Sequence, residues 1–170
     1  MTNWSYDSTP PWELRKTEIT SVVVEEGVTT IGSYAFRDCG NLTAVTLPDG
    51  LETIGDQAFY LCKQLTDIEL PDGLRDIGSH ALGQTGLREI EIPDSVMSIG
   101  IDAFEYLYEL KKVKLPAGLT EIPGWGFYCC TQLTSISIPE TVTVIREWAF
   151  SDLSNQVQHI MKFKIPKVLR

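Results

Sequence analysis

The stretch that decides the fold is residues 54–71, with the sequence IGDQAFYLCKQLTDIELP. The chain repeats this pattern, and successive copies begin 22 or 23 residues apart, at Ile31, Ile54, Ile77, Ile99, Ile122 and Ile145. A fixed period of this length is typical of a solenoid, in which each unit buries its apolar face by stacking on its neighbours. The sequence therefore predicts an array of six coils that share one core.

Five of the six copies contain a short apolar segment that ends in proline. The pattern L-x-x-I-x-L-P occupies residues 42–48, 65–71, 87–93, 110–116 and 133–139, and a sixth segment of the same kind, residues 19–24, has Glu25 in place of proline. Alternating aliphatic residues favour a strand, and proline ends it because proline has no N–H for the ladder. We expect these strands to form a parallel β-sheet on the concave face, with neighbours ~4.8 Å apart.

A second motif, A-F-x-x-C, follows each isoleucine, as at residues 58–62. Apolar residues at i, i+1 and i+4 fit one short helical or 3₁₀ turn, which we place on the convex face. The fold class is therefore a β-rich or α/β solenoid, which we expect to be right-handed. Its main core stack should be the phenylalanine column, formed by Phe36, Phe59, Leu82, Phe104, Phe127 and Phe150.

The pattern I-G-x-x-A-F-x-x-C-x-x-L-x-x-I-x-I-P resembles the BspA-type, or Treponema-type, leucine-rich repeat. The resemblance covers residues 19–153. It implies a bacterial surface or secreted protein that takes part in adhesion, so we expect the chain to be a fragment that lacks its signal peptide. A cytoplasmic location remains open.

The repeat divides the chain into three parts. Residues 1–18 contain Trp4, Tyr6 and Trp12 and are predicted to form an N-terminal cap, with a sugar-binding aromatic pair as the alternative. Residues 19–153 form the repeat array. Residues 154–170 leave the pattern and are predicted to be a C-terminal cap or a divergent last strand, centred on residues 160–165.

Composition excludes several classes of protein. The formal net charge of −9 argues against a nucleic-acid-binding protein, which would present a basic surface. No apolar run is long enough to cross a membrane, so we expect no membrane insertion. Nothing in the pattern requires a cofactor.

Catalytic and metal-binding patterns are also missing from the sequence. His80 lies in a column that other copies fill with unrelated residues, and we interpret it as solvent-facing rather than as a general base. Cys39, Cys62 and Cys130 share a column with Thr85 and are too far apart in sequence for a zinc motif. We expect free buried thiols, no metal site and no enzyme activity.

The concave face is the first candidate for a binding surface. Its outward residues place acids at Glu89 and Glu91 next to Lys112 and Lys114, either as cross-strand ion pairs or as a recognition surface. The candidate residues are Thr43, Thr46, Thr66, Asp67, Glu69, Arg88, Glu89, Glu91, Lys111, Lys112, Lys114, Ser135 and Ser137.

The convex face carries the second candidate. Trp125 and Trp148 occupy matched positions in adjacent copies, with Tyr128 nearby. They form either a stacking platform for a sugar or protein, or a shield over Gly124 and Gly126. The sequence thus favours a monomeric, non-enzymatic module that binds a protein or glycan of unknown identity. The alternative is a structural spacer that presents another domain.

Overall fold

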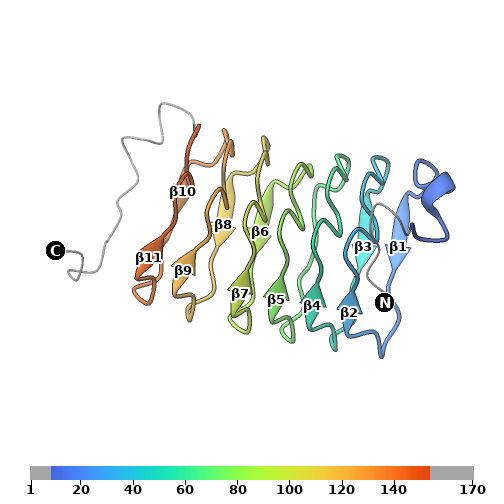
Figure 1. Ribbon diagram of the computed structural model, residues 1–170, viewed down its shortest axis with the longest axis horizontal. Coiled ribbons are helices and arrows are strands. Elements are labelled where there is room, and N and C mark those ends of the chain that lie inside the picture. Colours follow the sequence, from blue (N-terminus) through green and yellow to red (C-terminus); the bar gives the residue numbers. More distant parts are fainter. Residues whose placement is uncertain (1–8, 154–170) are drawn as a thin grey trace.

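The computed structural model describes residues 9–153 as a row of coils that stand side by side (Figure 1). We name each coil after its isoleucine, from the Ile31 coil to the Ile145 coil. The strand predicted around residues 160–165 lies outside the described residues, as do Trp4 and Tyr6.

One side of the coils, which we call the long-strand face, carries five of the six predicted strands, and the exception is the segment at residues 65–71, which forms no strand. The five strands are β1 (Ser21–Val23), β3 (Ala44–Thr46), β6 (Glu89–Glu91), β8 (Lys112–Lys114) and β10 (Ser135–Ile136). β1 pairs with β3, and β8 pairs with both β6 and β10, always in parallel. The register is one coil, so that Glu89 lies opposite Lys112. The parallel-strand solenoid predicted from the repeat is confirmed.

A second row of two-residue strands, the short-strand face, was not predicted. It consists of β2 (Thr30–Ile31), β4 (Thr53–Ile54), β5 (Asp76–Ile77), β7 (Ser98–Ile99), β9 (Glu121–Ile122) and β11 (Val144–Ile145). β2, β4, β5 and β7 form one parallel sheet, and β9 pairs with β11. Each repeat isoleucine is thus a strand residue. The segments are too short for their alternation to be recognised in the sequence.

The convex segments are hydrogen-bonded turns, and the only helix among residues 9–153 is the short 3₁₀ helix η1 (Glu13–Arg15). In the Ile31 coil, Ala35 N–H donates to the Gly32 oxygen at 3.3 Å, the i→i+3 bond of a 3₁₀ turn. Tyr34 N–H instead donates to Asp56 of the next coil at 2.9 Å. A left-handed φ of 62° at Tyr34 interrupts the helical path.

A left-handed φ recurs at two positions in every coil, four residues apart, and we call the first of these positions the outer column. Its residues all have a positive φ although none is glycine: Tyr34, Gln57, His80, Asp102, Trp125 and Trp148. Because the backbone is the same at each position, side chains of this column project in the same direction one coil apart. The column therefore brings together residues that are 22 or 23 positions apart in sequence.

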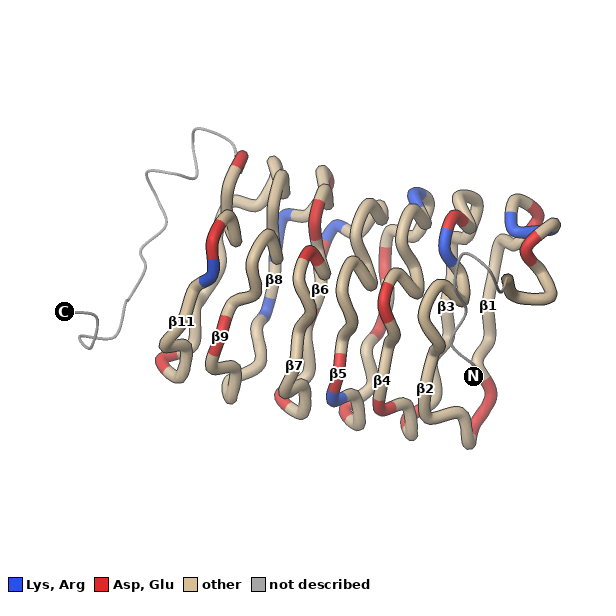
Figure 2. The backbone as a smooth tube through the Cα atoms, viewed as in Figure 1, with Lys and Arg blue, Asp and Glu red and all other residues tan. Residues whose placement is uncertain are grey.

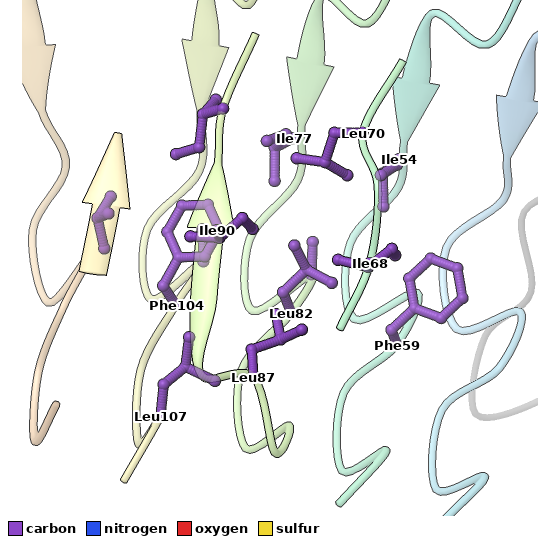
Figure 3. Packing of buried hydrophobic residues seen from close by; sticks show 14 of the residues in the cluster. Ile54, Phe59, Ile68, Leu70, Ile77, Leu82, Leu87, Ile90, Phe104 and Leu107 are labelled. Carbon is purple, nitrogen blue, oxygen red and sulfur yellow. The ribbon is translucent and has the colours of Figure 1, made fainter. Parts of the chain in front are cut away.

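The phenylalanine column forms the predicted core stack (Figure 3). Ring centroids lie 5.4 Å apart for Phe36 and Phe59 and 5.2 Å apart for Phe104 and Phe127. Leu82 is fully buried and fills the position between the two stacks. Trp12 continues the stack at its N-terminal end, where its ring lies 5.5 Å from that of Phe36.

Glycines after the isoleucines allow neighbouring backbones to approach closely on the short-strand face. A Cβ added to Gly55, Gly78 or Gly100 would lie only 2.4–2.6 Å from a backbone nitrogen of the preceding coil. None of the three has a positive φ. Close approach between coils, rather than φ, therefore accounts for glycine here.

Candidate functional sites on the outer surfaces of the coils

All thirteen residues predicted as a binding surface are exposed on the long-strand face. Figure 2 shows the basic segment at β8 within this row of strands. Lys112 Nζ lies 3.8 Å from Glu89 Oε2, and Lys114 donates a hydrogen bond to Glu91. That hydrogen bond raises the pKa of Lys114. Cross-strand ion pairs, one of the two interpretations of this surface, are present, but such exposed pairs contribute little to stability.

The row of long strands is interrupted in the Ile54 coil, where residues 66–70 form no strand. Arg88 N–H still donates to the Thr66 oxygen at 3.3 Å, so the one-coil register is kept. This register places Asp67 and Glu69 on one side of Glu89 and Glu91. Lys112 and Lys114 lie opposite the same two acids on the other side. Like charges directly opposite each other destabilise strand pairing.

The interruption opens a groove of about 760 Å³ on the long-strand face. Its charged lining consists of two lysines and six acids: Lys112, Lys114, Asp67, Glu69, Asp72, Glu89, Glu91 and Asp94. Both lysines are already paired with Glu89 and Glu91, whereas Asp67 and Glu69 form no ion pair with any residue of the described part. The groove is therefore strongly acidic, which suits a cationic ligand.

The convex aromatic residues lie together, as predicted. Trp125 and Trp148 stack with ring centroids 5.4 Å apart and an interplanar angle of 20°. Tyr128 packs edge-on against Trp125, at 4.8 Å. Trp148 is 55% exposed, so its indole ring can stack against a planar or apolar ligand. A Cβ added to Gly124 would lie 3.4 Å from the Glu147 oxygen, and one added to Gly126 would lie 3.0 Å from Pro123.

A cluster that the sequence analysis missed surrounds His80. Its Nδ1 lies 2.7 Å from Glu105 Oε1, and its Nε2 lies 3.7 Å from Asp102 Oδ2. The Tyr60 ring packs edge-on against the imidazole at 5.8 Å. His80 therefore lies among carboxylates and is not the freely solvated side chain that we expected. The signal was present in the sequence, because Asp102 follows His80 in the outer column.

Gly83 makes room for Glu105 in this cluster. A Cβ at Gly83 would lie 3.0 Å from Glu105 Cγ and 3.2 Å from the Tyr60 ring, so a side chain there would displace both. The Glu105 side chain is 9% exposed, and burial raises the pKa values of both Glu105 and Asp102. Within the described residues, these three side chains form the one group with the ligand types and spacing to hold a metal ion.

The cysteine column is buried and holds free thiols, as expected. The thiols of Cys62 and Cys130 donate to carbonyl oxygens of the preceding coil, Phe36 at 3.1 Å and Phe104 at 3.2 Å. Burial raises the pKa of Cys39 to about 11 and that of Cys130 to about 12, which keeps these thiols protonated and unreactive. They are structural residues.

Three comparisons place the chain among known proteins. The sequence model of the BspA type leucine rich repeat region matches residues 13–85 and 75–168. No curated protein matches the chain. Among solved structures, a leucine-rich repeat protein from Bacteroides ovatus is 31% identical, with a TM-score of 0.78 over 83% of this chain and 39% of that one.

Two further structures are similar. The T. pallidum leucine rich repeat protein TpLRR is 30% identical, with a TM-score of 0.77 over 85% of this chain and 69% of that one. The pneumococcal vaccine antigen PcpA is 25% identical, with a TM-score of 0.58 over 79% of this chain and 38% of that one. This chain thus spans well under half of the B. ovatus and pneumococcal proteins. The repeat match, which extends over most of the sequence, shows that the chain belongs to the BspA-type leucine-rich repeat family.

Proposed function

We propose that this domain is a non-enzymatic, monomeric binding module of a bacterial surface or secreted protein, and that it binds a basic segment of a protein partner through the acidic groove. The acidic groove, which Asp67 and Glu69 line with no counter-charge of their own, is the observation that carries the proposal. A partner that supplies lysine or arginine side chains would replace the missing counter-charges. Such complementarity accelerates association and selects among partners.

The surface location rests on relatives and remains part of the proposal. One relative is named as a pneumococcal vaccine antigen, which fits a protein that is accessible outside the cell. No helix in the described part of the chain has the length and apolar character needed to cross a membrane. Fractionation of the native cells, with the domain detected by antibody, tests the location.

The binding proposal is tested on an array of extracellular-matrix proteins and glycans, with the intact domain as the probe. Asp67→Asn with Glu69→Gln removes two groove charges while keeping the shape of both side chains. The matched control is Glu26→Gln with Glu140→Gln, which makes the same change in net charge at exposed positions outside the groove. We expect the first pair to weaken binding and the control pair to leave it unchanged. Equal binding by both pairs would refute the groove as the site.

A second candidate is glycan binding by Trp125, Trp148 and Tyr128, supported by the exposed indole of Trp148. Trp148→Ala would then abolish signals on glycan spots while leaving protein spots unchanged. A domain that binds neither class of ligand would instead favour the spacer function, in which the coils only hold another domain at a distance.

A further inference from the structure

We propose that His80 and Asp102, with Glu105 as the supporting group, form a binding site for a divalent transition-metal ion of the zinc class. Ligand atoms of the three side chains lie within 4.8 Å of one another. They come from two adjacent coils, so a bound ion would join the Ile77 coil to the Ile99 coil. The site is separate from the acidic groove and does not depend on the proposed partner.

The first step is the geometry of the outer column. His80 and Asp102 have similar left-handed φ values of 53° and 59° and lie one coil apart, so their side chains run parallel. Nε2 of His80 lies 3.7 Å from Asp102 Oδ2, which is longer than a hydrogen bond. Two ligands on one zinc ion, each about 2.0–2.2 Å from the metal, lie about 3.4 Å apart in tetrahedral geometry. The observed spacing therefore leaves space for an ion between them.

The second step is the orientation of the imidazole. Glu105 Oε1 lies 2.7 Å from Nδ1, a distance at which the carboxylate accepts a hydrogen bond from Nδ1–H. That bond leaves a lone pair on Nε2, the ring nitrogen that lies 3.7 Å from Asp102 Oδ2. Histidines that bind metals usually have their second nitrogen held by a carboxylate in this way, which also makes the ligand more basic. Glu105 is thus a positioning residue rather than a ligand.

The third step is charge. The side chains of Asp102 and Glu105 are only 17% and 9% exposed, and neither forms an ion pair with a lysine or arginine among residues 9–153. Burial disfavours the charged form of both carboxylates, and a single imidazole is the one basic side chain that contacts them among residues 9–153. A divalent cation supplies the missing positive charge. A nitrogen ligand favours zinc, nickel or copper over magnesium and calcium, which prefer oxygen ligands alone.

The site is a partly open one, since His80 is about one-third exposed. Water molecules would complete the coordination, and a donor from a partner molecule could replace them. Affinity should therefore lie well below that of a closed structural zinc site with four protein ligands. We expect the ion to bind reversibly and to stabilise the contact between the Ile77 coil and the Ile99 coil.

Titration calorimetry with zinc chloride on the whole chain tests the proposal. We expect one ion per chain, a rise in Tm with zinc but not with magnesium, and loss of at least about tenfold in affinity for His80→Ala and Asp102→Asn. Glu105→Gln keeps an oxygen for the Nδ1–H bond but removes the charge, and should also weaken binding by about tenfold or more. Circular dichroism checks that each variant is folded.

The partly exposed thiol of Cys129 provides the control, because a cysteine sulfur is a strong zinc ligand that could compete with the proposed site. Cys129→Ser should bind zinc as the wild type does, and Co²⁺ should give no thiolate-to-cobalt charge-transfer band. The proposal is overturned by wild-type affinity in His80→Ala, by a thiolate band with Co²⁺, or by the absence of binding at millimolar zinc.

Discussion

The interrupted strand of the Ile54 coil gives a prediction in which repulsion can be turned into attraction. Asp67 and Glu69 stand beside Glu89 and Glu91, whereas the next coil presents Lys112 and Lys114 to the same two acids and pairs with them in a regular sheet. The double change Asp67→Lys with Glu69→Lys places opposite charges on both sides of β6. We expect it to extend the sheet into residues 66–70 and to stabilise the protein.

The magnitude follows from cross-strand pairs. A pair of opposite charges contributes about 0.2–1 kcal/mol, and like charges cost a similar amount. The double change replaces two repulsive pairs by two attractive pairs, so the gain in the free energy of unfolding can reach a few times the contribution of one pair. Glu89 and Glu91 already share their charge with lysines, so the expected gain is about 0.5–2 kcal/mol in the free energy of unfolding. The acidic groove should narrow as the strands pair.

Urea unfolding at low and high salt measures this effect. Salt shortens the screening length from about 10 Å at 0.1 M to about 3 Å at 1 M. The wild type should therefore gain stability on addition of salt, whereas the double variant should gain less or lose some. Glu26→Lys with Glu140→Lys makes the same change in net charge at exposed sites outside the groove and serves as the control. An equal gain in the control would show that net charge, rather than local repulsion, limits stability, and would refute the reasoning.

Three other predictions concern the coils and the buried acids. Gly100→Ala places a Cβ 2.4 Å from backbone of the preceding coil and should lower the free energy of unfolding by about 1–3 kcal/mol in urea unfolding. Gly118→Ala, where nothing lies within 4 Å, should leave it nearly unchanged, and equal effects would contradict the close approach. Trp12→Ala removes the ring stacked on Phe36 and should lower the free energy of unfolding by about 2–4 kcal/mol, with a matching fall in Tm. This result is expected if residues 1–18 are a cap, and an unchanged Tm would argue against the cap. Burial raises the pKa of Asp102, so this group favours folding at acidic pH, and that stabilisation is lost as pH rises through its folded-state pKa. The free energy of unfolding, measured from pH 3 upward, should therefore fall less in Asp102→Asn than in the wild type. Parallel pH curves for the two proteins would contradict this prediction.

The sequence predicted the solenoid and its core because both depend on residues that recur in every copy. Isoleucine, phenylalanine and leucine return at fixed positions, and Phe59 and Phe104 lie in the core as expected. The short-strand face could not be predicted, because its strands contain two residues and depend on hydrogen bonds between coils. The absence of helices on the convex face could not be predicted either, because it also depends on hydrogen bonds between coils. The left-handed φ of non-glycine residues such as Tyr34, whose N–H bonds to the next coil, leaves no local sequence signal.

Candidate sites were less predictable than the core, because each site depends on residues that lie one coil apart. Alternate backbone N–H groups of the convex turns bond to the next coil, as Phe59 N–H does to Ala81 at 2.9 Å, so the coils are joined by bonds that do not depend on which outer side chains are present. Their identities are thus free to vary, and what they can do depends on the residues one coil away. Read along the chain, His80 has no partner. In the folded protein, however, His80 lies next to Asp102 of the outer column and next to Glu105, and this arrangement is the physical basis for the proposed metal site.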